Sequence, residues 1–90
     1  MKRHTKIYLE AMGYDETDFI PCEVCEAQAV DIHHIDAKGM GGDPTGSKDR
    51  IDNLMAVCRK CHSEFGDIEE LKPQLRIIHA HWMDLKGVQP

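Results

Sequence analysis

The chain has 90 residues, a formal net charge of −5 and 41% hydrophobic side chains. This length allows one domain with a modest core, because small domains bury a smaller share of their surface than large ones. The acidic excess argues against a protein that coats nucleic acid nonspecifically. Neither a membrane span nor secretion is expected, since no apolar run approaches about 18 residues and the N-terminus lacks the apolar block of a signal peptide.

The first predicted element is a helix over residues 5–12, where apolar side chains recur on one helical face. Gly13 follows at a position where helices commonly end. Residues 28–35 are rich in β-branched side chains and partly alternate in polarity, which predicts a strand. Residues 36–50 contain several glycines and a proline, so we expect a loop there.

Further elements are predicted after this loop. Residues 51–57 indicate a second short strand, antiparallel to the first if the loop folds back. Residues 58–65 indicate a tight turn that runs into a short helix, broken at Gly66. The clearest predicted helix covers residues 73–85, where a proline in the first turn precedes apolar side chains at helical spacing. Asp67 could cap a turn before it.

The cysteines form two Cys-x-x-Cys pairs, Cys22 with Cys25 and Cys58 with Cys61, separated by the 32 residues from 26 to 57. Two residues between cysteines let both sulfurs reach one ion from a tight turn, and two such turns complete a tetrahedral zinc shell. Redox pairs or disulfides are the alternative, but a redox pair belongs on a strand–helix–strand unit that is not predicted here. We therefore expect a structural Zn²⁺ ion, whose binding can contribute about 10–16 kcal/mol to a small domain.

Polar residues suited to metal-assisted hydrolysis stand beside these pairs, namely His33, His34, Asn53 and His62. A neutral imidazole with a pKa near about 6.5 can act as a general base at cellular pH. A divalent ion can offset the negative charge that develops when a phosphodiester is hydrolysed. The alternatives are structural: ordinary histidines at 33 and 34, a turn residue at 53, or a zinc ligand at 62 in place of a cysteine.

The order Cys-x-x-Cys, His-His-Ile, Gly-Gly, Asn-Leu-Met and Cys-x-x-Cys-His resembles the HNH endonucleases over about residues 22–66. The resemblance implies a ββα-metal finger. It implies that His34 is the general base and that His33 and His62 hold a catalytic divalent ion, which would be Mg²⁺, Mn²⁺, Ni²⁺ or Zn²⁺. It also implies that Asn53 orients the base.

Two points of geometry bear on this assignment. Some members of the family carry a third histidine at the position of Gly66, so two imidazoles and water would hold the ion here. Adjacent residues of a regular strand point to opposite faces, so His33 and His34 share one site only if the strand ends or bends there.

The predicted fold is one small α+β domain over residues 1–90. Its parts are an N-terminal helix and loop (1–21), the zinc-containing core (22–66) and a C-terminal helix (67–90). His79 and His81 stand two apart on that helix and are expected in surface or packing roles. His4, near a fraying end, is not expected in the site, and Trp82 is expected in the core.

The predicted function is metal-dependent cleavage of DNA, most consistent with double-stranded DNA. Basic residues are candidates for phosphate contacts: Lys38, Lys48, Arg50, Arg59 and Lys60. Because the chain is acidic overall, weak and salt-sensitive DNA binding is expected, together with a partner such as phage packaging proteins that delivers it to DNA. A cytoplasmic protein encoded by a bacterium or phage is expected. The alternatives are a noncatalytic zinc-stabilised module that binds nucleic acid or protein, and a degenerate nuclease kept for assembly.

Overall fold

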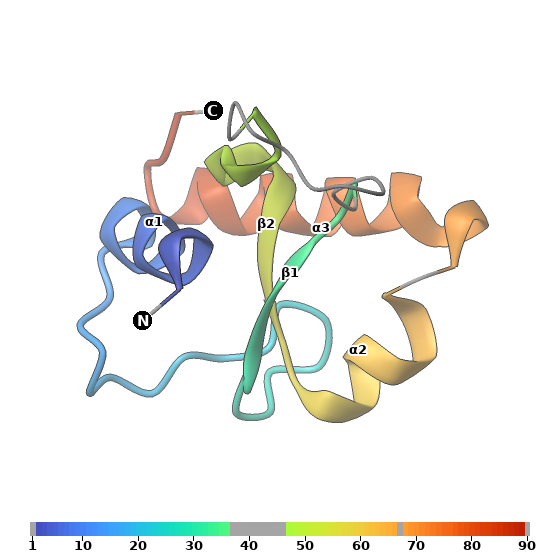
Figure 1. Cartoon of the computed structure of the whole chain (residues 1–90), viewed down its shortest axis with the longest axis horizontal. Coiled ribbons are helices and arrows are strands. Elements are labelled where there is room, and N and C mark those ends of the chain that lie inside the picture. Colours follow the sequence, from blue (N-terminus) through green and yellow to red (C-terminus); the bar gives the residue numbers. More distant parts are fainter. Residues whose placement is uncertain (1, 37–46, 67, 90) are drawn as a thin grey trace.

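The computed structural model describes residues 2–36, 47–66 and 68–89. The described part contains helices and a two-stranded antiparallel sheet, which confirms the predicted α+β fold (Figure 1). In chain order the elements are α1 (Arg3–Met12), β1 (Asp31–His34), the 3-10 turns η1 (Ser47–Asp49) and η2 (Ile51–Asn53), β2 (Leu54–Val57), α2 (Arg59–Phe65), the 3-10 turn η3 (Glu69–Leu71) and α3 (Lys72–Leu85). No described helix is long and apolar enough to cross a membrane.

The two strands pair as predicted, with His34 opposite Leu54. Both are shorter than the predicted ranges 28–35 and 51–57. The segment ahead of β1 pairs instead with the chain that precedes the first cysteine. β2 begins later than predicted because the three residues before it form the turn η2. The last of them, Asn53, donates its backbone N–H to the carbonyl oxygen of Arg50.

The three predicted helices are present. α1 begins at Arg3, slightly earlier than predicted, and ends at Gly13, whose φ of 77° lies in the left-handed region that glycine adopts without strain. α2 ends before Gly66 as predicted. α3 carries Pro73 in its first turn. The predicted cap at Asp67 lies outside the described residues.

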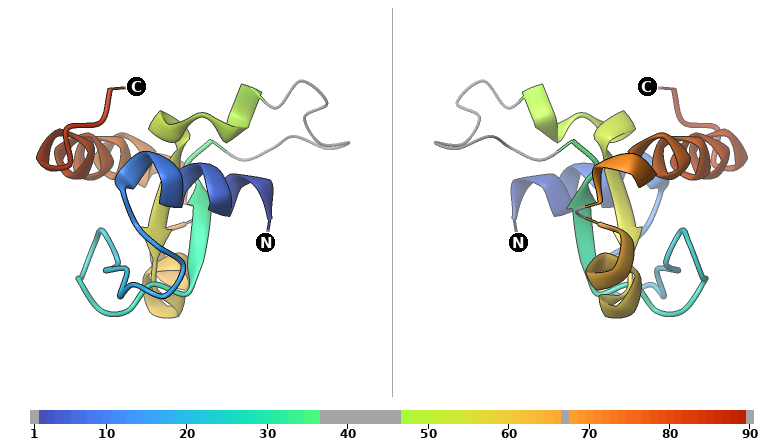
Figure 2. Two further views of the ribbon diagram at one scale, coloured as in Figure 1. Left: turned by 90° about the vertical axis from the view of Figure 1, so that its left-hand side faces the viewer. Right: turned by 90° about the vertical axis from the view of Figure 1, so that its right-hand side faces the viewer.

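Apolar packing joins these helices to the strands. α1 and α3 lie near one end of the sheet and α2 near the other (Figure 2). One buried cluster joins α1 and α3 to both strands through Tyr8, Leu9, Met12, Ile32, Leu54, Ala56 and Met83. Partly buried Trp82 packs against it, as expected of a core residue. A second cluster surrounds the cysteines and includes Ile35, Met55, Val57 and Leu75. The two clusters pack against both strands, and so position His33 and His34 at the end of β1 and Asn53 before β2.

Candidate functional site

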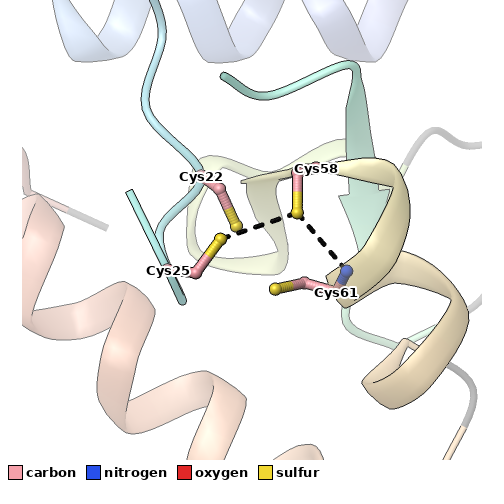
Figure 3. A group of neighbouring side chains, drawn as sticks. All are labelled: Cys22, Cys25, Cys58 and Cys61. Atoms are coloured by element: carbon pink, nitrogen blue, oxygen red, sulfur yellow. Dashed lines mark hydrogen bonds between the residues drawn. The ribbon is translucent and has the colours of Figure 1, made fainter. Parts of the chain in front are cut away.

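The two Cys-x-x-Cys pairs come together in space. All four sulfur atoms lie within 4.8 Å of one another, and the Sγ atoms of Cys25 and Cys58 are 3.6 Å apart. Figure 3 shows the four side chains gathered from the turn before β1 and from the start of α2. A tetrahedral shell with zinc–sulfur bonds of about 2.3 Å has sulfur separations of about 3.8 Å. The cluster therefore fits a structural Zn²⁺ ion.

The backbone around the cluster prepares its sulfurs for a metal. Cys58 caps α2, and its Sγ accepts the backbone N–H of Cys61 at 3.4 Å. This N–H, together with side-chain hydrogen bonds from the three other cysteines, lowers the pKa of Cys58 to about 7 against the opposing effect of burial, which favours the thiolate that binds metals. Burial, together with the neighbouring sulfurs, raises the pKa of Cys61. The charge of a bound ion would be needed to ionise Cys61 as well.

His33 and His62 face each other across the gap between β1 and α2. Their ring centroids are 4.9 Å apart. The buried His33 ring places Nε2 2.8 Å from the carbonyl oxygen of Gly66, and because a carbonyl only accepts, Nε2 donates and the lone pair of the neutral ring is on Nδ1. Metal-binding histidines commonly donate their other N–H to such a carbonyl. The pair therefore has the surroundings of metal-ligating imidazoles.

Gly66 lies directly against this pair. A β-carbon at this position would stand 2.6 Å from the carbonyl oxygen of His62, 2.8 Å from its Cδ2 and 3.2 Å from Cε1 of His33. This position thus borders both rings, and a side chain here would have to displace His62. Glycine leaves the two imidazoles in place.

His34 contacts a different set of residues from its neighbour. Its Nε2 is 2.7 Å from Oδ1 of Asp49, a carboxylate that is 3% exposed. Its ring lies 4.5 Å from the ring of His4, between centroids. The alternation of side chains along β1 accounts for the separation. The structure therefore brings His33 to His62, and His34 to His4 and Asp49.

Asn53 ties the two sides of this region together. Its buried amide accepts the backbone N–H of Asp36 at 2.8 Å and donates to the carbonyl oxygens of Asp36 at 3.0 Å and Lys48 at 2.8 Å. The backbone carbonyl of Asn53 also accepts the N–H of Ile35 at 2.9 Å. These bonds join the chain just after His34 to the 3-10 turn that ends at Asp49. Asn53 thus fixes the backbone on both sides of the contact between His34 and Asp49.

The structure describes four of the five basic residues predicted to contact DNA. Arg59 and Lys60 are exposed on the first turn of α2, and Arg50 is exposed with Asp52 3.4 Å away. The Nζ atom of Lys48 is 3.6 Å from Asp36. Lys38 lies outside the described residues.

The structure adds two cations from α3 that sequence reasoning missed. Arg76 and Lys72 reach Asp36 at 3.1 and 3.7 Å, beside Lys48. Their place on a helix far along the chain offered no local signal. No local pattern connected His4 or Asp49 with His34 either. The first contact depends on how α1 packs against the strands, and the second on the path of the backbone through η1.

Comparison with known proteins gave one match. The family model described as HNH endonuclease matches residues 22–67, just over half of the chain, and spans both cysteine pairs, both strands and α2. No curated protein and no solved structure matches the chain.

Proposed function

Because the chain belongs to the HNH endonuclease family, we propose that it is a metal-dependent endonuclease that nicks or breaks DNA. Proteins of this family are generally nucleases. The observation that carries the proposal is the arrangement at the end of β1. There His33 faces His62 at 4.9 Å between ring centroids. His34 contacts a buried carboxylate away from that pair, but it is the last residue of β1, so a phosphate at the strand end can meet both His34 and an ion on the His33–His62 pair.

His34 is the proposed general base. The carboxylate of Asp49 accepts the N–H of Nε2, which leaves the lone pair of the neutral ring on Nδ1. Nδ1 takes the proton of a water molecule as that water attacks phosphorus, and the carboxylate stabilises the imidazolium that forms. The bond from phosphorus to the 3′ oxygen breaks and that oxygen takes a proton from solvent water, giving 5′-phosphate and 3′-hydroxyl ends. Asn53 is the positioning residue for this base.

His33 and His62 are the proposed ligands of a divalent ion. Because Nε2 of His33 donates to the carbonyl oxygen of Gly66, the neutral ring carries its lone pair on Nδ1, the atom proposed to bind the ion. When bound there, Mg²⁺, Mn²⁺, Ni²⁺ or Zn²⁺ would supply charge stabilisation for the phosphate and the leaving oxygen. Two imidazoles alone leave positions open for water and phosphate oxygens.

DNA, in double-stranded form, is the proposed substrate. Lys38, Lys48, Arg50, Arg59 and Lys60 are the proposed phosphate contacts, and the structure supports adding Lys72 and Arg76. The cations around Asp36 lie close to the base, since Asp36 follows it by two residues. Net charge of −5 supports weak binding and delivery by a partner such as phage packaging proteins.

A noncatalytic zinc-stabilised binding module is the second candidate. The feature that favours it is Gly66, which leaves the His33–His62 pair without a third protein ligand from α2. Such a module would bind DNA or protein through the same basic residues without hydrolysing a bond.

Nicking of supercoiled plasmid by the zinc-loaded protein separates the two. We expect relaxed circles with at least one of Mg²⁺, Mn²⁺, Ni²⁺ and Zn²⁺, and none when a chelator too weak to remove the cysteine-bound zinc takes up the added ion. DNA binding in a gel-shift assay without nicking by any of the four ions would favour the binding module instead.

A further inference from the structure

We propose that His4, His34 and Asp49 form a second site for a divalent transition metal, apart from the His33–His62 pair, and that an ion bound there inhibits the nuclease. The second half rests on the proposed function, while the first does not. The three residues come from separate elements: the first turn of α1, the end of β1 and the end of η1.

The donor set suits such an ion. One ligand atom from each of the three residues lies within 4.8 Å of the others. In a tetrahedral site with bonds of about 2.0–2.1 Å, ligand atoms stand about 3.4 Å apart. Small side-chain rotations therefore suffice to close the set around an ion. Two imidazoles and one carboxylate are ligands that Zn²⁺, Ni²⁺ and Co²⁺ accept, whereas Mg²⁺ prefers oxygen ligands alone.

Burial of the carboxylate supports a cation at this place. The Asp49 side chain is 3% exposed, and a buried carboxylate requires compensation by positive charge or hydrogen bonds. The imidazole of His34 contacts it, and the exposed Arg3 approaches the other carboxylate oxygen at 3.8 Å. A divalent ion between the carboxylate and the two rings would add positive charge beside this buried carboxylate.

The fold holds the three ligands in position before any ion binds. Asn53 fixes the chain on both sides, through Asp36 after β1 and Lys48 in η1. Residues Tyr8, Leu9 and Met12 bury one face of α1 against the strands, which carries His4 to His34. The site thus depends on tertiary packing and not on a sequence motif.

Occupation of this site would remove the proposed base. A bound ion would take a ring nitrogen of His34 and also the carboxylate that fixes its tautomer. Transition metals should therefore inhibit cleavage supported by Mg²⁺, and His4 should matter for the inhibition although it has no part in the proposed chemistry.

Cobalt binding tests the site directly. Protein that already carries one zinc per chain is titrated with Co²⁺, and the visible absorption of nitrogen- and oxygen-bound Co²⁺ gives stoichiometry and affinity. The absence of thiolate-to-cobalt absorption shows that the cysteine site keeps its zinc. We expect His4→Ala to weaken one Co²⁺ site by about tenfold or more, Asp49→Asn to do the same, and both His62→Ala and His81→Ala to leave that site intact.

His4→Ala should fold, because His4 is only half-buried and alanine favours helices. Equal Co²⁺ binding by His4→Ala and the unmodified protein would overturn the proposal. So would a site that is lost in His62→Ala and retained in His4→Ala, or the absence of any Co²⁺ binding beyond the cysteine cluster.

Inhibition is measured on plasmid nicking at fixed Mg²⁺ with increasing Zn²⁺. We expect His4→Ala to need about tenfold more Zn²⁺ for half-inhibition, and an unchanged requirement would overturn the inhibitory role. Because cobalt binding does not depend on nicking, a protein that binds Co²⁺ as described but cuts no DNA supports the site and contradicts the proposed nuclease.

Discussion

Nδ1 of His79 lies 2.7 Å from a carboxylate oxygen of Glu23, and both side chains are at most 1% exposed. The other ring nitrogen contacts the carbonyl oxygen of Ile51 at 2.6 Å, so it must donate. Glu23 in turn accepts the hydroxyl of Tyr8 and the backbone N–H of Ala56. This buried network joins α1, α3 and β2 to the first cysteine turn.

Replacing His79 should therefore remove much of the free energy that stabilises the folded domain. We expect His79→Ala to lower the free energy of unfolding by about 3–5 kcal/mol, because it leaves the buried Glu23 side chain without its imidazole partner. Denaturant unfolding at saturating zinc measures this loss. His81→Ala, an exposed neighbour on the same helix, is the matched control and should change stability little. Equal effects of the two substitutions would contradict the account.

The contribution of His79 should also depend on pH. Burial lowers the pKa of His79, but the hydrogen bond and charge of Glu23, the Ile51 carbonyl and the charge of Asp52 raise it, and the net pKa is above its ordinary value. A raised pKa in the folded state gives stability that is complete below about 6.5, the unfolded value, and is lost as pH rises through the folded value. The stability difference between the unmodified protein and His79→Ala should shrink over that range. A stability difference that grows as pH rises would contradict a raised pKa for His79.

Features that depend on residues close together in the sequence could be predicted, whereas features that depend on distant residues could not. The cysteine pairs and the helix ends at Gly13 and Gly66 rest on local patterns, and the structure confirms them. The orienting role of Asn53, which the family resemblance implied, stays a prediction. Strand length was overestimated, because pairing partners and not residue type decide where β1 and β2 begin.

Contacts made by the flanking helices could not be predicted. His4 and Arg76 reach the region around His34 only because α1 and α3 pack against the strands. The burial of His79 similarly depends on which face of α3 meets Glu23. The spacing of apolar residues indicates that a helix has an apolar face. It does not indicate which polar residues from other parts of the chain lie beside that helix once it packs.

Metal removal should unfold the protein. We expect one tightly held zinc per chain by elemental analysis, and loss of helical circular dichroism when a strong chelator removes it, because the cysteines join β2 and α2 to the turn before β1. Cys58→Ser should behave like the metal-free protein, since it removes a zinc ligand while the serine hydroxyl can still cap α2. Retention of the full helical signal without zinc would contradict a structural role for the ion.

A side chain at Gly66 should disturb the His33–His62 pair. We expect Gly66→Ala to lower stability by about 1–3 kcal/mol through overpacking, because its β-carbon would press on His62. It should reduce nicking by more than the loss of folded protein explains. Gly87→Ala is a useful comparison, since its β-carbon would meet nothing within 4 Å although its φ of 69° imposes backbone strain. Full activity of Gly66→Ala would show that the pair tolerates displacement.

The nicking rate of His34→Ala, measured beside His81→Ala on supercoiled plasmid with the ion that best supports the unmodified protein, tests the central claim most directly. Loss of a general base should slow cleavage by about 100-fold or more, while His81→Ala should nick at the unmodified rate and both variants should keep their zinc and helical signal. Nicking by folded His34→Ala at the rate of His81→Ala would contradict the assignment of His34 as the base.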